Sequence, residues 1–476
     1  MAEVKLFGYC NNISVRPGDE QTFHVTADGT DTAEAQLVRL IHGDQHPDGP
    51  GFIEEEVDCE INGAWQVKKQ YTQVGSYLQV PDPENRLCID GSFSMFTYIW
   101  PSLHPKVGAQ AVCGRYDDFN NIGYAFGIDE TGHLGFIVAD GKEFDAVLSE
   151  IPLQRHIWYF IGASYDASTG RATLHQMGVV NRYNSLWGKV TPMDYDSHVS
   201  ETLRFKPKHA PDISFLVGGT WDFHANRGKF VNELYSGKVD RPGVVSRALS
   251  REEFDHICSG GKPPKNDILA YWDTSVGYTD TGIGDTVTDT GPHGLHAIGV
   301  NKPVRAQTGW NWNGRNDCFR LAPEEYGGIE FHDDAIIDCG WDVTHRLTIP
   351  DNLKSGVYAI RLRAGEGTGL GEEYIVFFIR AKTPRAPIAL LIPTASYLAY
   401  ANDHLTFDAQ MAQPIVGQTP IVSDIDIEVY QSPEFGLSTY DHHRDGAGVC
   451  YSSYRRPIVS LHPKYRNPMN GVTWQF

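Results

Sequence analysis

The chain has 476 residues, more than a single hydrophobic core normally serves, so its length predicts about three domains. Apolar residues make up 41% and charged residues 21% of the chain, which excludes a disordered or fibrous protein. The formal net charge is −20 at pH 7 and the sequence contains no basic patch, which argues against nucleic acid and anionic membranes as partners.

The first ten residues, Met1 to Cys10, carry no signal-peptide pattern, and no apolar run approaches the length of a membrane span. We therefore expect a soluble, cytoplasmic protein. The eight cysteines are widely scattered and include no Cys-x-x-Cys pair, which excludes a zinc ribbon and a dense disulfide framework. They are predicted to be buried free thiols.

The chain begins with a strand-like pattern. Apolar and polar residues alternate from Val4 to Ile41 around a turn at Arg16 to Asp19, which predicts three strands. Three strands are too few to close a β-sandwich, so this stretch needs a second contribution from elsewhere in the chain.

Residues 62–312 contain a long series of short predicted strands separated by turns, the pattern of an all-β domain. The pattern, together with the late segment from Leu234 to Phe254, resembles the laminin-G-like, or concanavalin-A-like, jelly-roll family. Ser250 and Glu253 have the capping-box spacing and predict a short helix. The clearest predicted strands are Ser92–Pro101, Gly123–Asp129, His133–Val138, Trp158–Asp166 and Arg171–His175.

Two patterns could be mistaken for binding sites. Asp117, Asp118, Asn120 and Asn121 could be calcium ligands, but they lack an ordered spacing of oxygen ligands, so a polar hairpin tip is favoured. The glycine-rich run from Gly365 to Gly369 lies between two predicted strands with no helix after it, so a hairpin is favoured over a dinucleotide site.

The stretch from Asn313 to Ala381 is β-rich as well, and its turn from Ile349 to Tyr358 is typical of the last half of an immunoglobulin-like sandwich. We predict that residues 1–61 plus 313–381 form one discontinuous small β-sandwich, into which the jelly roll of residues 62–312 is inserted. The strands predicted here are Val343–Ile349, Gly356–Arg363 and Glu373–Ile379.

The pattern changes after a linker at Lys382 to Pro387. The unbroken apolar run from Ile388 to Ile392, with prolines on both sides, predicts a strand buried on both faces, and polar and aromatic residues follow it directly. Residues 388–476 are therefore predicted to be the start of an α/β catalytic domain, too short to be complete. The later elements predicted are helix or irregular structure at Ala399–Gln413, a partly alternating segment at Ile421–Tyr430 and a further strand at Pro457–Leu461.

Familiar catalytic motifs are missing: the sequence has no Gly-x-Ser-x-Gly, no phosphate-binding Gly-x-x-x-x-Gly-Lys-[Ser/Thr] and no His-Glu-x-x-His. Cys450 lacks the small following residue of a tight elbow, so a buried structural thiol is favoured over a nucleophile.

Tyrosine and histidine gather near the end of the chain, where they are expected to be mostly core or surface residues. Tyrosine can nevertheless bind a metal as the phenolate, whose formation needs a strong Lewis acid such as ferric iron. The group comprises Tyr397, Tyr400, His404, Tyr430, Tyr440, Asp441, His442, His443, Tyr451, Tyr454 and His462.

Three segments, Leu390 to Asn402, Gly436 to Asp441 and Arg455 to Pro457, resemble the large subunit of the N,N-dimethylformamidase family. The predicted domain order agrees with that family: a split sandwich, an inserted jelly roll and a glutamine-amidotransferase-like α/β domain. The resemblance implies hydrolysis of N-substituted formamides, with N,N-dimethylformamide giving dimethylamine and formate. It also implies a mononuclear iron held by two tyrosines and a glutamate.

By position, the resemblance implies that Tyr400 and Tyr440 are the tyrosine ligands, with Tyr397 as the runner-up for the first. The family's His-Pro-Glu stretch, which supplies the carboxylate ligand and a histidine, has no match, because Lys464 follows His462 and Pro463 here. The third ligand is therefore expected outside this chain, which resembles the N-terminal portion of the large subunit. The implied partners are a small (alpha) subunit, further copies of the large subunit and a small-molecule amide.

Two hypotheses result. The first is an iron-dependent amide hydrolase, in which ferric iron polarises the formyl oxygen or lowers the pKa of a bound water. The alternative, from another class, is a non-catalytic glycan-binding protein that acts through the laminin-G-like domain. Stoichiometric iron would support the first, whereas calcium together with retention on a sugar column would support the second.

Overall fold

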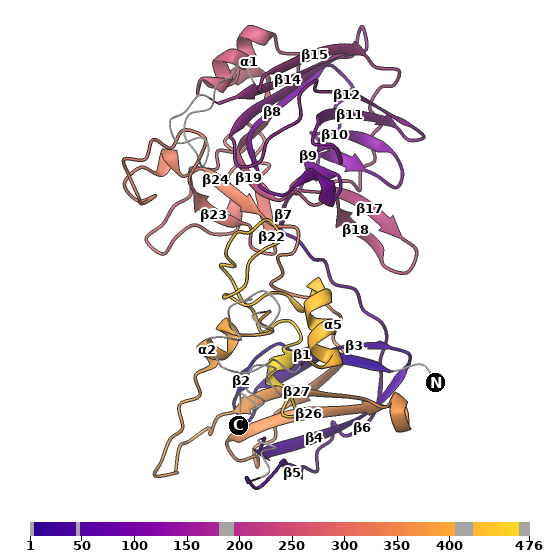
Figure 1. Cartoon of the computed structure of the whole chain (residues 1–476), viewed down its shortest axis with the longest axis vertical. Helices are drawn as coiled ribbons and strands as arrows, with labels where there is room; N and C mark the ends of the chain where they lie inside the picture. The colour runs from indigo at the N-terminus through magenta and orange to yellow at the C-terminus, as the bar shows by residue number, and fades with distance from the viewer. Residues whose placement is uncertain (1–3, 44–47, 180–194, 405–421, 466–476) are drawn as a thin grey trace. The chain divides into compact units, whose positions relative to one another are not determined.

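The computed structural model describes residues 4–43, 48–179, 195–404 and 422–465. The fold is mainly β, as predicted, and it divides into two compact units (Figure 1). One combines Met1–Val74 with Ile336–Phe476, and we call it the split unit. The other, Gly75–Ala335, is the continuous unit. The domain boundaries predicted from the sequence that lie nearest to those of these two units are 61/62 and 312/313.

The split unit contains two sheets, one with the strand order β1-β3-β25 and one with the order β2-β27-β26-β4-β5, in which β6 also pairs with β4. The pairing is antiparallel except between β2 and β27. The strands are β1 Lys5–Cys10, β2 Ser14–Val15, β3 Glu20–Asp28, β4 Thr32–His42, β5 Ile53–Glu56, β6 Gly63–Gln66, β25 His345–Thr348, β26 Gly356–Ala364 and β27 Gly371–Ile379.

Strands from the two ends of the split unit share one core. Side chains alternate between the two faces of β4, and Leu37 points to the core. There it belongs to the same hydrophobic cluster as Phe23 of β3 and Phe377 of β27. Leu37 lies opposite Ile360 in the register of β4 with β26, although more than 300 residues separate them. Because each sheet combines strands from both stretches, the front of the chain depends on β25, β26 and β27 to bury its apolar faces.

The continuous unit also has two sheets, with strand orders β12-β11-β10-β9-β16-β7-β22-β21 and β15-β14-β13-β8-β19-β24-β23. The first sheet contains β7 Tyr77–Val80, β9 Gln110–Asp117, β10 Ile122–Ile128, β11 Leu134–Asp140, β12 Phe144–Leu148, β16 Phe215–Val217, β17 Thr220–His224, β18 Gly228–Asn232, β21 Thr286–Val287 and β22 Ala297–Val300. The second contains β8 Phe93–Pro101, β13 Tyr159–Asp166, β14 Arg171–Gly178, β15 Ser197–Thr202, β19 Gly237–Val245, β20 Ile268–Tyr271, β23 Val304–Gln307 and β24 Gly328–Phe331.

Helix α1, Arg251–Cys258, covers the outer face of the second sheet. The capping box predicted from Ser250 and Glu253 is present at its N-terminus. Phe254 packs with Phe96 of β8, whereas Phe93 of the same strand belongs to the core between the sheets. Strand β8 is therefore buried on both faces, which explains why nearly all of its residues are buried.

The predicted calcium-like loop is a hairpin tip between β9 and β10. Asn120 donates from its backbone nitrogen and its amide to the two carboxylate oxygens of Asp117, at 3.0 and 2.9 Å. The glycine-rich run from Gly365 likewise joins β26 to β27 in a hairpin. Both patterns are turns, as predicted.

The buried strand predicted at residues 388–392 is wrong. The segment forms no strand, and Ile388, Leu390 and Leu391 are 84%, 83% and 91% exposed. An apolar run becomes a buried strand only where neighbouring strands offer hydrogen bonds and cover both of its faces, and the described residues supply neither.

Two later predictions are also wrong. The alternating segment ending at Tyr430 is helix α5, Asp424–Gln431, because Ser423 and Asp426 form a capping box. Its Ile425 and Val429, four residues apart, pack beside Phe435, as on one face of a helix. Pro457–Leu461 contains a 3₁₀ turn rather than a strand.

The remaining short helices are α2 Thr394–Ala399 and the 3₁₀ helices η1 Pro105–Val107, η3 Lys265–Asp267, η4 Pro323–Glu325, η5 Gly367–Gly369, η6 Pro433–Phe435 and η7 Val459–Leu461. The predicted Ala399–Gln413 element falls on the end of α2 and on residues 405–413, which lie outside the described residues. Among the described helices, none has the length and apolar content needed to cross a membrane.

Candidate functional site

Tyr400 and Tyr440 lie face to face in the split unit. Their ring centroids are 4.2 Å apart and their planes differ by 17°. Tyr400 is the C-cap residue of α2, and Tyr440 lies in a turn after η6. The hydrogen bond with Tyr440 raises the pKa of Tyr400 above its ordinary value, with desolvation as the next cause. Tyr440 is 49% exposed, so a small molecule can reach the pair.

Tyr397 has a different environment. It packs against an apolar cluster that contains Leu40 and Ala359, on the sheet of the split unit. The structure thus places the preferred candidate, Tyr400, against Tyr440 and gives Tyr397 a packing role.

Both tyrosines lie where regular structure ends, so nearby backbone groups need side-chain partners. Arg456, which is 1% exposed, supplies several. It donates to the carbonyl oxygens of Phe435 at 2.6 Å, Leu437 at 2.8 Å and Ser453 at 3.2 Å. Burial lowers the pKa of Arg456 to about 10, so the guanidinium remains charged at neutral pH. Within the described ranges no carboxylate pairs with it.

Asn402 joins the Tyr400 turn to two other segments. Its backbone has φ +58°, a left-handed conformation that asparagine tolerates. The buried amide donates to the carbonyl oxygens of Phe435 and Pro457, both at 2.9 Å, and accepts from the backbone nitrogen of Val459 at 2.9 Å. The turn after Tyr400 is therefore held by three bonds from one side chain.

Asp441 plays the same part beside Tyr440. Its carboxylate, 3% exposed, accepts from the backbone nitrogens of Ser438 at 2.8 Å and His404 at 2.9 Å. The Ser438 hydroxyl then accepts from the backbone nitrogen of Tyr440 at 3.1 Å. Asp441 thus joins the turn that carries Tyr440 to the segment that follows Tyr400.

His404 belongs to the same tyrosine and histidine group of the sequence. The ring of His404 packs on Tyr430 at 5.0 Å, and its Nε2 is buried without a hydrogen-bond partner in the described part of the chain. None of the described cysteines forms a disulfide, and three of them, Cys10, Cys113 and Cys339, are buried as predicted. Cys450 is exposed rather than buried, because it lies in an irregular segment that is open to solvent.

A metal at the tyrosine pair would need a further ligand. In the described ranges, no group of three or more His, Cys, Asp or Glu side chains is arranged to hold a metal ion. Two phenol oxygens are hard donors that suit ferric iron. The pair therefore fits part of an iron site, and the carboxylate expected from outside this chain would add to it.

A family model described as "N,N-dimethylformamidase beta subunit-like, C-terminal" matches residues 304–475. The N,N-dimethylformamidase beta subunit of Paracoccus aminophilus is 40% identical over 483 residues, which cover 100% of this chain and 62% of that protein. The corresponding subunit of Alcaligenes sp is 38% identical over 482 residues, with the same coverage. The chain is thus similar to N,N-dimethylformamidase beta subunits over its whole length.

The chain spans 62% of the length of the curated beta subunits that it matches. Among solved structures, a putative carbohydrate binding protein from Bacteroides ovatus aligns with 62% of this chain and 90% of its own, at 11% identity. The TM-score is 0.33, so this likeness supports no argument about fold or ligand.

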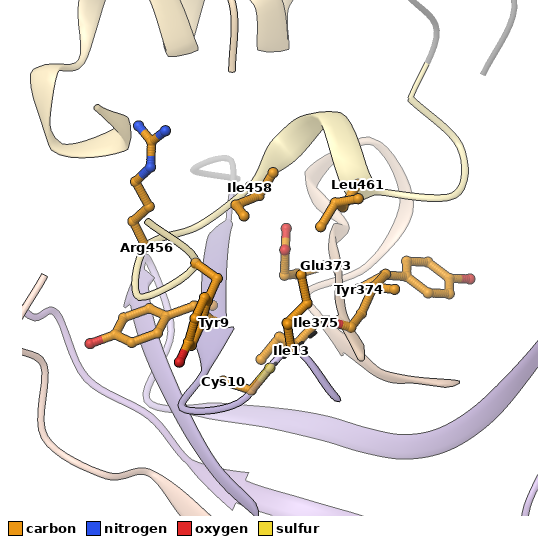
Figure 2. A pocket seen from close by; sticks show the side chains of 12 residues that line it. Tyr9, Cys10, Ile13, Glu373, Tyr374, Ile375, Arg456, Ile458 and Leu461 are labelled. Carbon is orange, nitrogen blue, oxygen red and sulfur yellow. Dashed lines mark hydrogen bonds between the residues drawn. The ribbon is translucent and has the colours of Figure 1, made fainter. Parts of the chain in front are cut away.

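The split unit also contains a cavity of about 20 Å³, room for about one water molecule, beside β1, β27 and the segment around η7. Figure 2 shows the Glu373 carboxyl group directed into it, toward Ile458 and Leu461. Glu373 is 7% exposed, and its carboxyl makes no hydrogen bond to the described residues. Burial, and then the charge of Glu372, hold the pKa of Glu373 well above its usual range.

We expect the buried Glu373 carboxyl group to make the wild-type protein less stable as pH rises, and we expect Glu373→Gln to remove this loss. The folded-state pKa is raised above the unfolded value of about 4.3, so the stability contributed by Glu373 is complete below that value and is lost as pH rises through the folded pKa. The thermal midpoint of Glu373→Gln minus that of the wild type should therefore grow with rising pH. The other titratable groups that line the cavity are Tyr9, Cys10, Tyr374, Tyr454 and Arg456.

Glu366→Gln is the matched control, because Glu366 is exposed in the β26–β27 hairpin. Its midpoint should follow that of the wild type at every pH. A Glu373→Gln curve parallel to the wild-type curve would show that Glu373 does not bind a proton on folding.

The side chains that hold the backbone around the tyrosine pair, and the carboxyl group in the cavity, were not predicted as site residues from the sequence. Arg456 and Asn402 entered only as part of a resemblance, and Glu373 only as a strand residue. Their roles depend on partners far away in the sequence. No local signal marks them, because Arg456 lies between Arg455 and Pro457, and Asn402 lies between Ala401 and Asp403.

Proposed function

We propose that this chain is part of an iron-dependent hydrolase of N-substituted formamides, which converts N,N-dimethylformamide to dimethylamine and formate. The observation that carries the proposal is the stacking of Tyr400 on Tyr440, at the positions that the family resemblance assigns to the two tyrosine ligands. The family match supports the substrate class.

Tyr400 and Tyr440 would hold the iron through their phenolate oxygens, together with a carboxylate from outside this chain. Ferric iron supplies Lewis acidity there, which polarises the formyl oxygen or lowers the pKa of a water. The chain's own contribution is to hold the two phenols together and to leave Tyr440 partly open to solvent. Asp441 and Asn402 limit the movement of the two turns, so little reorganisation is needed when a substrate enters.

The test is to purify the protein from cytoplasm, where we propose that it works, together with its partners. About one iron per chain and equal release of formate and dimethylamine from N,N-dimethylformamide are expected. An iron-free preparation that still hydrolyses the amide would contradict the iron proposal. Calcium without iron, with retention on a sugar column, would favour the glycan-binding alternative.

We propose in addition that the split unit contains an immunoglobulin-like sandwich and that the continuous unit is a laminin-G-like jelly roll. The residues after Pro387 would belong to a glutamine-amidotransferase-like α/β domain that is complete only in a longer protein or in an assembly. The exposed apolar side chains of Ile388, Leu390 and Leu391 support this, because such a run is normally covered. A small subunit and further copies of this subunit are the proposed partners, and a particle with the mass of a lone monomer would contradict them.

Leu391→Glu should have little effect on this chain alone and a large effect on the assembly. Leu391 is 91% exposed, so in this chain alone the change should alter stability by no more than about 0.5 kcal/mol. In the full-length protein with its partners, it should lower the thermal midpoint or block assembly, because a charge would be buried. Leu321→Glu is the control, since Leu321 is 72% exposed in the continuous unit. Equal effects of both changes in the assembly would contradict covering of Leu391.

A further inference from the structure

We infer that Arg456 is a positioning residue for the tyrosine pair; the inference rests on the proposed function. One guanidinium reaches the backbone beside both tyrosines. Its Nη2 donates to Leu437 O at 2.8 Å, three residues before Tyr440, and more weakly to Ala401 O at 3.4 Å, the residue after Tyr400.

A second path leads from the same guanidinium to the helix that ends at Tyr400. Nη2 also donates to the Ser452 hydroxyl at 3.2 Å, and that hydroxyl donates to Leu398 O, in the last turn of α2, at 2.6 Å. The backbone nitrogen of Thr439 donates to Ala399 O at 2.9 Å, which joins the Tyr440 turn to α2 directly. Displacement of the Arg456 head would therefore loosen both tyrosine-bearing segments.

The chemistry of these contacts requires arginine. The planar guanidinium offers five donors in a fixed fork, and the three segments present carbonyl oxygens and a hydroxyl to it. In the described residues no carboxylate lies within hydrogen-bond distance of Arg456, and the charge of Asp441 acts on it from further away. Lysine keeps the charge, but its single compact ammonium group cannot reach all of these acceptors. Arg456→Lys thus separates geometry from charge.

The experiment measures the tyrosine pair in protein without metal. Photo-oxidation with a ruthenium complex and persulfate couples neighbouring tyrosines, and mass spectrometry quantifies the peptide that joins Tyr400 to Tyr440. A hydrogen bond to a charged group changes an equilibrium about tenfold or more, so Arg456→Lys should lower this yield by about that factor. Ser452→Ala, a milder change, should lower it less while the protein stays folded.

Arg305→Lys is the matched control. Arg305 is 8% exposed and also donates to backbone carbonyls, those of Gly284 and Thr286, but it lies in the continuous unit. It should lose stability comparably and keep the wild-type yield of the Tyr400–Tyr440 peptide. Wild-type yields in folded Arg456→Lys and Ser452→Ala would overturn the inference. Because no metal is added, a wild type that crosslinks but binds no iron would contradict the proposed function alone.

Discussion

Tyr440→Phe is expected to abolish iron binding and amide hydrolysis and to leave the fold intact. Phenylalanine keeps the ring that stacks on Tyr400 and removes the only atom of this side chain able to bind a metal. The stability cost should be about 1 kcal/mol, that of one hydrogen bond. Iron affinity should fall by more than the roughly 10–100-fold that is typical of outer-shell changes, since a direct ligand is lost.

Iron content, the tyrosinate-to-iron charge-transfer colour and formate release measure this prediction, with circular dichroism as the check on folding. Tyr397→Phe is the matched control, because Tyr397 packs on the sheet of the split unit and should leave iron and activity nearly unchanged. An iron-replete, active Tyr440→Phe protein would remove Tyr440 from the ligand set. A loss in Tyr397→Phe alone would transfer the role to the runner-up.

Gly436→Ala is expected to cause the largest loss of stability near the site. Gly436 has φ +65°, and a Cβ there would lie 2.2 Å from Arg456 Nη1 and 2.4 Å from a side-chain carbon of Ile336. Strain in this backbone region costs about 1–3 kcal/mol, and overpacking a core costs about 1–3 kcal/mol more. The unfolding free energy of the split unit should therefore fall by roughly 2–6 kcal/mol.

Urea unfolding measures this loss, and Gly446→Ala is its control. Gly446 also has a positive φ, +90°, but no atom lies within 4 Å of the position that a Cβ would take there, so this variant has the backbone strain without the clash. The difference between the two variants measures the close approach of Arg456 and Ile336. Equal losses in both would mean that both side chains can move aside.

Much of the β architecture could be predicted from the sequence. In β3 the apolar residues Phe23, Val25 and Ala27 alternate with polar ones because one face of the strand meets a core, and such a pattern is visible in any short window. The capping box of Ser250 and Glu253 is equally local, because both residues lie within one helical turn. Tyr400 and Tyr440 were also reached from short segments of the sequence, through resemblance.

The tertiary structure decided the rest, since those features depend on distant neighbours. An apolar run from Ile388 is compatible with a buried strand, but burial needs partner strands, and the described residues offer none. The spacing of Ile425 and Val429 is compatible with both an alternating strand and a helix. The structure contains the helix, and both side chains pack beside Phe435. Three of the four carbonyl groups to which Arg456 donates lie 19 to 55 residues away, at positions that no local pattern reveals. A sequence thus determines local periodicity and capping, whereas the pairing of buried polar groups is fixed only when the chain has folded around them.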